Sequence, residues 1–178
     1  MTSTIQSSDN LGRRVRIRNQ YLSLAFDGRT GELIELCRQS TGENLLKNWF
    51  SSRSMPFCIE ISNTDGESAQ LTAPTYHQVL ADAELRPHFT FQPGSTGGEM
   101  LQIRYAQLYA ESGSVNVGAC VSVTLPEDDC ESIWELELDC SESPADVVLN
   151  GRVSAVKFPC VFGVFHGRSW QDDTLVYP

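Results

Sequence analysis

The side chains best suited to contact a ligand gather near the C-terminal end of the chain. They are His166, Arg168, Trp170, Asp172 and Tyr177, and a glycine lies close to His166 on each side. An exposed indole can stack on a sugar ring while neighbouring charged groups bond the ring hydroxyls. One interpretation of this segment is therefore a carbohydrate-binding loop.

The same segment also has the features of an interface. The sequence stops one residue after the apolar run Leu175-Val176-Tyr177 and has no polar tail. An apolar strand without a successor would expose surface that another domain normally covers. We therefore expect a longer protein, in which Phe165, Trp170 and Tyr177 pack on a C-terminal catalytic domain or on a second copy of the chain. Sugar contact at Trp170 is the alternative.

Residue types that carry catalysis are present, but their spacing does not suit it. His77, His88 and His166 lie far apart in the sequence and form no pair with metal-binding spacing. The adjacent Asp172 and Asp173 would point to opposite faces of an extended strand, so they do not converge as an acid–base pair. The sequence also has no serine elbow and no phosphate-binding loop. It therefore predicts no metal site and no cofactor, and its catalytic residues, if any, are unknown.

The composition is that of a globular protein with an acidic surface. Of the 178 residues, 40% are hydrophobic and 20% are charged, and the formal net charge is −10 at pH 7. Nucleic-acid binding needs a basic face that neutralises phosphates, and anionic membranes also attract basic segments. We therefore expect neither a nucleic-acid nor a membrane partner. A neutral ligand such as a sugar is compatible with this charge.

The first ten residues, MTSTIQSSDN, have neither the basic region nor the apolar region of a secretory signal. The expected location is therefore the cytoplasm, where thiols stay reduced. No pair of cysteines has C-x-x-C spacing, so we expect unpaired and mostly buried thiols. The six cysteines are Cys37, Cys58, Cys120, Cys130, Cys140 and Cys160.

Apolar and polar residues alternate through most of the chain, as is typical of antiparallel strands with one buried face. Turn-forming runs such as Asp27-Gly28-Arg29-Thr30-Gly31 separate the alternating segments. The predicted fold class is all-β, an antiparallel β-sandwich over residues 13–178 that follows a flexible tail, residues 1–12. The only helix-like stretch is Glu43–Phe50.

The alternation also predicts where the strands lie and which residues face inward. Strands are expected near residues 14–18, 21–26, 32–38, 57–62, 100–109, 114–125 and 132–140. The inward set is expected to include Leu22, Leu24, Ile59, Ile103, Val117, Val121, Val123, Trp134, Leu136 and Leu138.

Two parts of the chain resemble a known domain. Residues 19–27 (NQYLSLAFD), 30–33 (TGEL) and 41–46 (TGENLL) resemble the opening hairpin of N-terminal β-domains in large glycoside hydrolases. Those domains belong to the galactose mutarotase-like supersandwich. Val153–Phe162 and residues 173–178 are similar to the closing strands of the same domains. At 178 residues the chain is short for a full supersandwich, so the resemblance implies a sandwich that lacks a strand or two.

The resemblance implies a non-catalytic β-sandwich domain of a carbohydrate-active enzyme, which packs on a catalytic (β/α)-barrel and helps to shape its sugar cleft. Two alternatives remain open. The chain could be a free-standing carbohydrate-binding module, or a sugar-ring epimerase or lyase with unrecognised catalytic residues. The mutarotases use histidines and a glutamate as acid and base, and we place no counterparts of those residues in this sequence.

Overall fold

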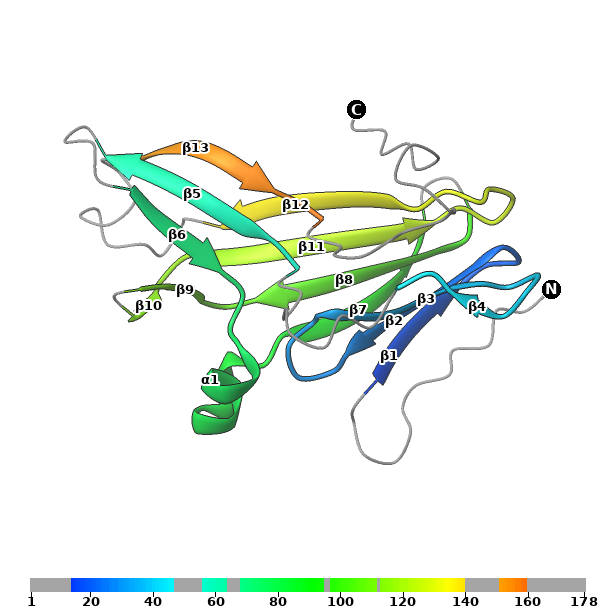
Figure 1. The fold of residues 1–178 in the computed structure, drawn as a ribbon, viewed down its shortest axis with the longest axis horizontal. Helices are drawn as coiled ribbons and strands as arrows, with labels where there is room; N and C mark the ends of the chain where they lie inside the picture. Colours follow the sequence, from blue (N-terminus) through cyan, green and yellow to red (C-terminus); the bar gives the residue numbers. More distant parts are fainter. Residues whose placement is uncertain are drawn as a thin grey trace.

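The computed structural model describes residues 14–46, 56–63, 68–94, 97–111, 113–139 and 151–159. In these ranges the chain forms thirteen strands, one short α-helix and one 3-10 turn, and the paired strands are antiparallel (Figure 1). The predicted all-β, antiparallel fold is confirmed. The expected tail, residues 1–12, lies outside the described ranges, as do parts of the expected domain 13–178.

The described strands form three sheets. The β1–β4 sheet has the order β1-β2-β3-β4, with bounds Arg14–Arg18, Leu22–Asp27, Leu33–Arg38 and Glu43–Asn44. The β5–β13 sheet has the order β10-β9-β6-β5-β13, with bounds Gly113–Val115, Leu108–Ala110, Ser68–Thr72, Cys58–Asn63 and Gly151–Lys157. The β7–β12 sheet has the order β12-β11-β8-β7, with bounds Ile133–Asp139, Gly118–Leu125, Glu99–Tyr105 and His88–Pro93. Between β6 and β7 lie the helix α1, Tyr76–Ala81, and the 3-10 turn η1, Ala83–Leu85.

One hydrophobic core joins the three sheets. The ring centroids of Phe26 on β2 and Trp134 on β12 lie 5.9 Å apart, and Phe57, next to β5, meets Tyr105 of β8 edge to face at 5.5 Å. The β7–β12 sheet therefore packs one face against residues of both other sheets. The large side chains that are almost completely buried are Phe26, Phe57, Ile17, Leu24, Ile59, Leu101, Ile103, Leu108, Leu125, Val79, Val117 and Val121.

The β2–β3 hairpin confirms the turn that the sequence predicts. The Asp27 carboxylate accepts hydrogen bonds from the backbone N–H groups of Arg29 and Thr30, at 2.7 and 3.1 Å. The backbone N–H of Gly31 donates to the carbonyl of Asp27 at 2.8 Å. Gly31 has a φ of 73°, which glycine adopts without the steric cost that a Cβ atom would bring. The local sequence therefore fixes the geometry of this turn.

A polar clamp connects the β1–β2 turn to the β11–β12 turn. The side-chain amide of Asn19 donates hydrogen bonds to the carbonyls of Pro126 and Asp129, at 2.7 and 2.8 Å. Its Oδ1 atom accepts from the backbone N–H groups of Tyr21 and Leu22, at 2.9 and 2.8 Å. Both polar atoms of one amide are thus used, and the two turns are held in a fixed relation.

Most of the predicted inward set lies in the core. The buried members are Leu24, Ile59, Ile103, Val117, Val121 and Val123. Leu22, Trp134 and Leu136 are half-buried and pack against the core. The prediction is wrong for Leu138, whose exposed fraction is 36%. Leu138 lies near the end of β12, opposite the small Ala119, and among the described strands β12 pairs with β11 alone.

The predicted strands 100–109 and 114–125 are each two strands. β8 ends at Tyr105 and β9 begins at Leu108, while β10 ends at Val115 and β11 begins at Gly118. In the second break the N–H of Val117 donates to the carbonyl of Val115 at 2.8 Å, which closes a tight turn. Val115 and Val117 are both buried, so the alternation of buried and exposed residues continues through the turn. The sequence pattern therefore does not reveal the turn. β4, β6, β7 and β13 are not among the strands predicted from the alternation.

The helix prediction is also wrong where it can be compared. Glu43–Asn44 forms β4, which pairs with β3, and residues 47–50 lie outside the described ranges. The helix α1 lies elsewhere and spans six residues, too few for a helical period to stand out in the sequence. Its first turn is fixed by a hydrogen bond from the N–H of Thr75 to Oε1 of Gln78, at 2.7 Å.

Candidate ligand-binding site

The C-terminal residues singled out by the sequence lie outside the described ranges. They are Phe165, His166, Arg168, Trp170, Asp172 and Tyr177, and their roles stay predictions. In the described part of the chain, His77 lies on α1 and His88 begins β7, and no group of three or more His, Cys, Asp or Glu residues could hold a metal ion. Within the same ranges, no helix is long and apolar enough to cross a membrane.

The β7–β12 sheet has a second face, which is polar. Residues directly opposite each other in an antiparallel pair project to the same side of the sheet. The register aligns His88 with Arg104, Arg104 with Cys120, and Cys120 with Glu137. These four residues form one row across all four strands, on the side away from the core residues Ile103 and Val121. The row carries an imidazole, a guanidinium, a thiol and a carboxylate.

This row lies in a groove at the end of the sheet, which we call the polar groove. The cavity measures about 720 Å³, and both charged and small residues line it. The lining residues are Glu84, Arg86, His88, Arg104, Tyr105, Ala106, Asn116, Gly118, Ala119, Cys120, Glu137, Leu138 and Asp139. They come from η1, from the start of β7 and β11, and from the end of β8 and β12, so segments distant in the sequence build one site.

The strand register places different chemical groups at the two sides of the polar groove. Neighbouring strands are about 4.8 Å apart, so Glu137 lies about 10 Å across the sheet from Arg104 and about 14 Å from His88. Arg86 precedes His88 by two residues, at the junction of η1 and β7. N–H donors therefore gather over β7 and β8, and the carboxylates of Glu137 and Asp139 lie over β12, while the carboxylate of Glu84 lines the groove from η1.

A row of hydrogen-bonded side chains next to the groove orients Arg104. Nε2 of Gln92 donates to Oε1 of Gln102 at 3.0 Å, and Nε2 of Gln102 lies 3.5 Å from Oγ of Ser122. The guanidinium of Arg104 lies 3.5 Å from the same Oε1 of Gln102. Three neighbouring strands are thus linked by amide side chains, and Arg104 is turned along the sheet.

Tyr105 lines the groove, but its hydroxyl is used elsewhere. The hydroxyl donates to the backbone carbonyl of Thr30 at 3.1 Å, inside the core. Burial of the ring raises the pKa of Tyr105 above its usual value, and the charge of Glu32 raises it further. The phenol is therefore a neutral structural donor, and the groups that can meet a ligand are the outer arginines, His88 and the carboxylates.

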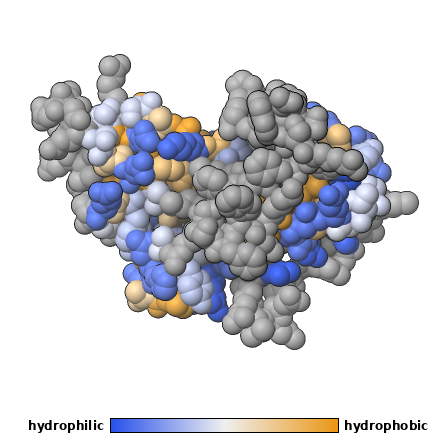
Figure 2. Space-filling model, in the orientation of Figure 1, coloured by the Kyte–Doolittle hydropathy of each residue, from blue (hydrophilic) through white to orange (hydrophobic). Residues whose placement is uncertain are grey.

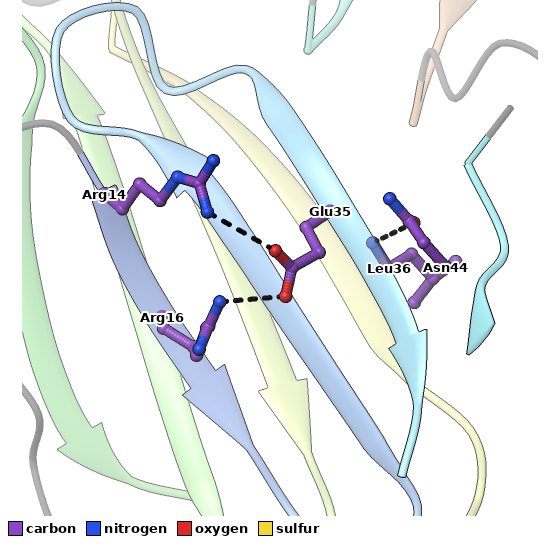
Figure 3. Close-up of polar contacts among 5 residues, drawn as sticks. All are labelled: Arg14, Arg16, Glu35, Leu36 and Asn44. Carbon is purple, nitrogen blue, oxygen red and sulfur yellow. Dashed lines mark hydrogen bonds and ion pairs between the residues drawn. The ribbon is translucent and has the colours of Figure 1, made fainter. Parts of the chain in front are cut away.

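The arginines of the groove differ from those of the β1–β4 sheet. On that sheet Glu35 lies between Arg14 and Arg16, at 3.6 and 2.8 Å, so these two cations are paired within the protein (Figure 3). In the described part of the chain, neither Arg86 nor Arg104 forms an ion pair with a carboxylate. The groove therefore offers cationic donors that the described residues do not neutralise.

Exposed apolar residues form a weaker candidate. Figure 2 shows hydrophobic surface over α1 and over β13. The exposed fractions are 56% for Leu80 on α1, and 54% and 51% for Val153 and Val156 on β13. Single exposed apolar residues are common on protein surfaces and need no partner. The polar groove remains the candidate with defined chemistry.

Sequence reasoning identified the polar phase of the strands but not the groove. Gln102, Arg104, Glu135 and Glu137 alternate with apolar residues, which assigns them to an outer face. The order of the strands, and the place of His88 beside Arg104, follow only from the tertiary pairing.

Comparison with known proteins adds no further constraint on the site. The chain matches no family model, no curated protein and no solved structure.

Proposed function

We propose that the chain is a non-catalytic β-sandwich domain of a carbohydrate-active enzyme, a glycoside hydrolase, and that it binds saccharide in the polar groove. The observation that carries the proposal is the convergence of Arg104, His88 and Glu137 from separate strands on one cavity of about 720 Å³. Small-molecule sites typically measure about 300–1,000 Å³ and combine a few convergent polar groups with apolar walls.

The chemistry of the groove suits a molecule rich in hydroxyl groups. A sugar hydroxyl both donates and accepts hydrogen bonds, so it can meet a guanidinium on one side and a carboxylate on the other. Arg104 and Glu137 supply these two kinds of partner from the same face of one sheet. Cys120 lies between them on the same face of the sheet, and its small side chain leaves room for a ring.

The absence of catalysis is part of the proposal. Glycoside hydrolysis needs two carboxyl groups on opposite sides of the scissile bond, roughly 5–10 Å apart. Glu137 and Asp139 both lie on the outer phase of β12, so they line one side of the groove together. The third groove carboxylate, Glu84, lies on η1 next to β7, and β7 is about 14 Å across the sheet from β12. A catalytic barrel would supply the chemistry, and the resemblance of residues 19–27, 30–33 and 41–46 to hydrolase N-terminal domains supports such a partner.

The proposal can be tested by binding measurements on the purified chain. Titration with a panel of mono- and oligosaccharides, followed by calorimetry or ligand-observed NMR, should detect binding. Arg104→Gln and Glu137→Gln should each weaken it at least tenfold. Arg18→Gln is the matched control, because Arg18 is an exposed arginine on β1, outside the groove, and it should leave affinity unchanged. If no saccharide binds, the proposed function is wrong.

The C-terminal segment gives a second test, which concerns the partner. We propose that Phe165, Trp170 and Tyr177 contact a catalytic domain or a second copy of the chain. Trp170→Ala should then weaken self-association or raise solubility, as measured by analytical ultracentrifugation. If the variant instead keeps its association state and loses saccharide-induced fluorescence quenching, the sugar site lies at Trp170 and not in the groove.

Turnover separates the proposal from its enzymatic alternatives. The chain alone should hydrolyse no glycoside and epimerise no sugar. Measurable turnover that is abolished by changing a single carboxylate or histidine would show a hydrolase, epimerase or lyase, and would contradict the non-catalytic assignment.

A further inference from the structure

We infer that the preferred ligand of the polar groove is an acidic saccharide, a uronic acid or an oligomer that contains one, with its carboxylate held by Arg104 and Arg86. This inference rests on the proposed function and specifies the class of sugar. It starts from the two arginines for which the described residues supply no carboxylate.

Arg86 and Arg104 are distinguished by their shared position in the groove. Arg18 and Arg29 likewise form no ion pair with a described carboxylate, but neither lines this groove. The sequence has 23 acidic and 13 basic residues, so carboxylates are plentiful. Elsewhere in the described ranges, Arg14, Arg16 and Lys157 each meet a glutamate within 4 Å. The groove also contains carboxylates, but the register separates Glu137 from Arg104 by the width of one intervening strand, about 10 Å between backbones, and Glu84 on η1 forms no ion pair with either arginine. A carboxylate from the ligand is therefore the partner that the β8 side of the groove can accept.

The donors on that side are arranged to receive one anionic group. His88 and Arg104 are direct partners in the antiparallel ladder, which puts their Cβ atoms about 4.5–5.5 Å apart on one face. Arg86 lies two residues before His88 and lines the same cavity. A guanidinium offers two parallel N–H groups that match the two oxygens of a carboxylate. Gln102 approaches Arg104 along the sheet at 3.5 Å and supports this orientation.

The far side of the groove defines the rest of the ligand. Glu137 is exposed, and it accepts hydrogen bonds but cannot donate them while ionised. It therefore suits ring hydroxyls and would repel a second carboxylate at that position. The inferred ligand is accordingly polar along its length, with its acid group over β7 and β8 and its hydroxyl groups over β12.

The test compares one sugar in two charge states. The probes are glucuronate- and galacturonate-containing disaccharides and their methyl esters, which keep the ring but remove the charge. The free acids should bind at least tenfold more tightly than the esters. Arg104→Gln should remove most of this preference, so that it weakens binding of the acids at least tenfold more than it weakens binding of the esters. Arg104→Lys, which keeps the charge without the paired N–H groups, should give an intermediate affinity.

Controls and contrary outcomes separate this inference from the proposed function. Arg18→Gln should not change the affinity of either probe, and a far-UV spectrum should show that each variant keeps its strands. Equal binding of acid and ester, with both weakened by Arg104→Gln, would overturn the acidic-sugar inference and leave saccharide binding in place. Acid binding that is insensitive to Arg104→Gln and Arg104→Lys would overturn the assigned position. If neither probe nor any neutral sugar binds, both proposals are wrong.

Discussion

The hydroxyl of Tyr105, on β8, donates a hydrogen bond to the backbone carbonyl of Thr30, in the β2–β3 hairpin, at 3.1 Å. Both residues are buried, and the bond spans 75 positions of the sequence. It joins the β1–β4 sheet to the β7–β12 sheet and satisfies a carbonyl that is closed off from water. Buried polar groups without a partner are rare because they carry a large desolvation cost.

Tyr105→Phe removes the donor and keeps the ring, so the carbonyl of Thr30 becomes a buried acceptor without its partner. We expect the free energy of unfolding to fall by about 1–3 kcal/mol. Urea denaturation followed by far-UV circular dichroism measures the change. Tyr21→Phe is the control, because Tyr21 is 41% exposed and its hydroxyl can bond water. An equal loss in both variants would contradict a specific role for the buried bond.

The ionisation of Tyr105 should also contribute to the pH dependence of stability. Burial raises the pKa of Tyr105 in the folded protein, while the unfolded chain titrates near its ordinary value of about 10. Above that pH the unfolded state loses the proton first, so stability is highest below pH 10 and falls as the pH rises. The fall between pH 9.5 and 11 should be smaller in Tyr105→Phe than in the original protein. Parallel curves for the two proteins would contradict the raised pKa.

Gly31→Ala should destabilise the protein more than Gly42→Ala. Both glycines have positive φ values, 73° and 67°, so alanine brings backbone strain of about 1–2 kcal/mol at either position. A Cβ atom at Gly31 would also collide with the hydroxyl of Tyr105, whereas nothing lies within 4 Å of one at Gly42. We expect Gly31→Ala to cost about 1–3 kcal/mol more, as overpacked cores do. Equal urea midpoints would show that the hairpin moves freely away from Tyr105.

Leu101→Ala should lower the free energy of unfolding much more than Leu138→Ala, although both residues lie on the β7–β12 sheet. Leu101 is completely buried, so truncation should cost about 2–5 kcal/mol. Leu138 has an exposed fraction of 36% and lines the groove, so its truncation should cost less than about 1 kcal/mol. Thermal or urea unfolding measures both. A large loss at Leu138 would mean that this residue is covered in solution.

Thiol labelling should follow exposure. Cys130 is exposed, whereas burial raises the pKa of the Cys58 thiol and leaves less reactive thiolate. Burial, with Glu35 next, also raises the pKa of Cys37. In native protein at pH 8, mass spectrometry after brief iodoacetamide treatment should find that, of the four described cysteines, Cys130 is labelled first and Cys58 last.

The four described cysteines, Cys37, Cys58, Cys120 and Cys130, are unpaired, which confirms that part of the thiol prediction. Only Cys58 of the four is buried, so the expectation of mostly buried thiols is wrong for them. Cys140 and Cys160 lie outside the described ranges. Denatured, non-reduced protein should therefore titrate with close to six thiols. A count of two or fewer would contradict the expectation of reduced cysteines for the whole chain.

The sequence by itself determined the local geometry of the protein. Alternation assigned Val121 and Val123 to the core and Arg104 to the outer face, because successive side chains of a strand point to opposite sides. The Asp27–Gly31 turn was equally readable, since its hydrogen bonds and its positive φ depend on residues within the turn. Neither inference required knowledge of distant contacts.

Only the tertiary structure decided which strands are neighbours, and therefore what the groove contains. A period of two gives each residue a face but no partner, so nothing in the sequence aligned His88 with Arg104 or Cys120 with Glu137. The segment 114–125, predicted as one strand, is interrupted at Asn116, and its two parts belong to different sheets. The alternation of apolar and polar residues continues across this interruption, so the sequence pattern does not reveal it. The exposure of Leu138 has the same origin, because burial depends on what covers a strand end and not on the phase of the strand.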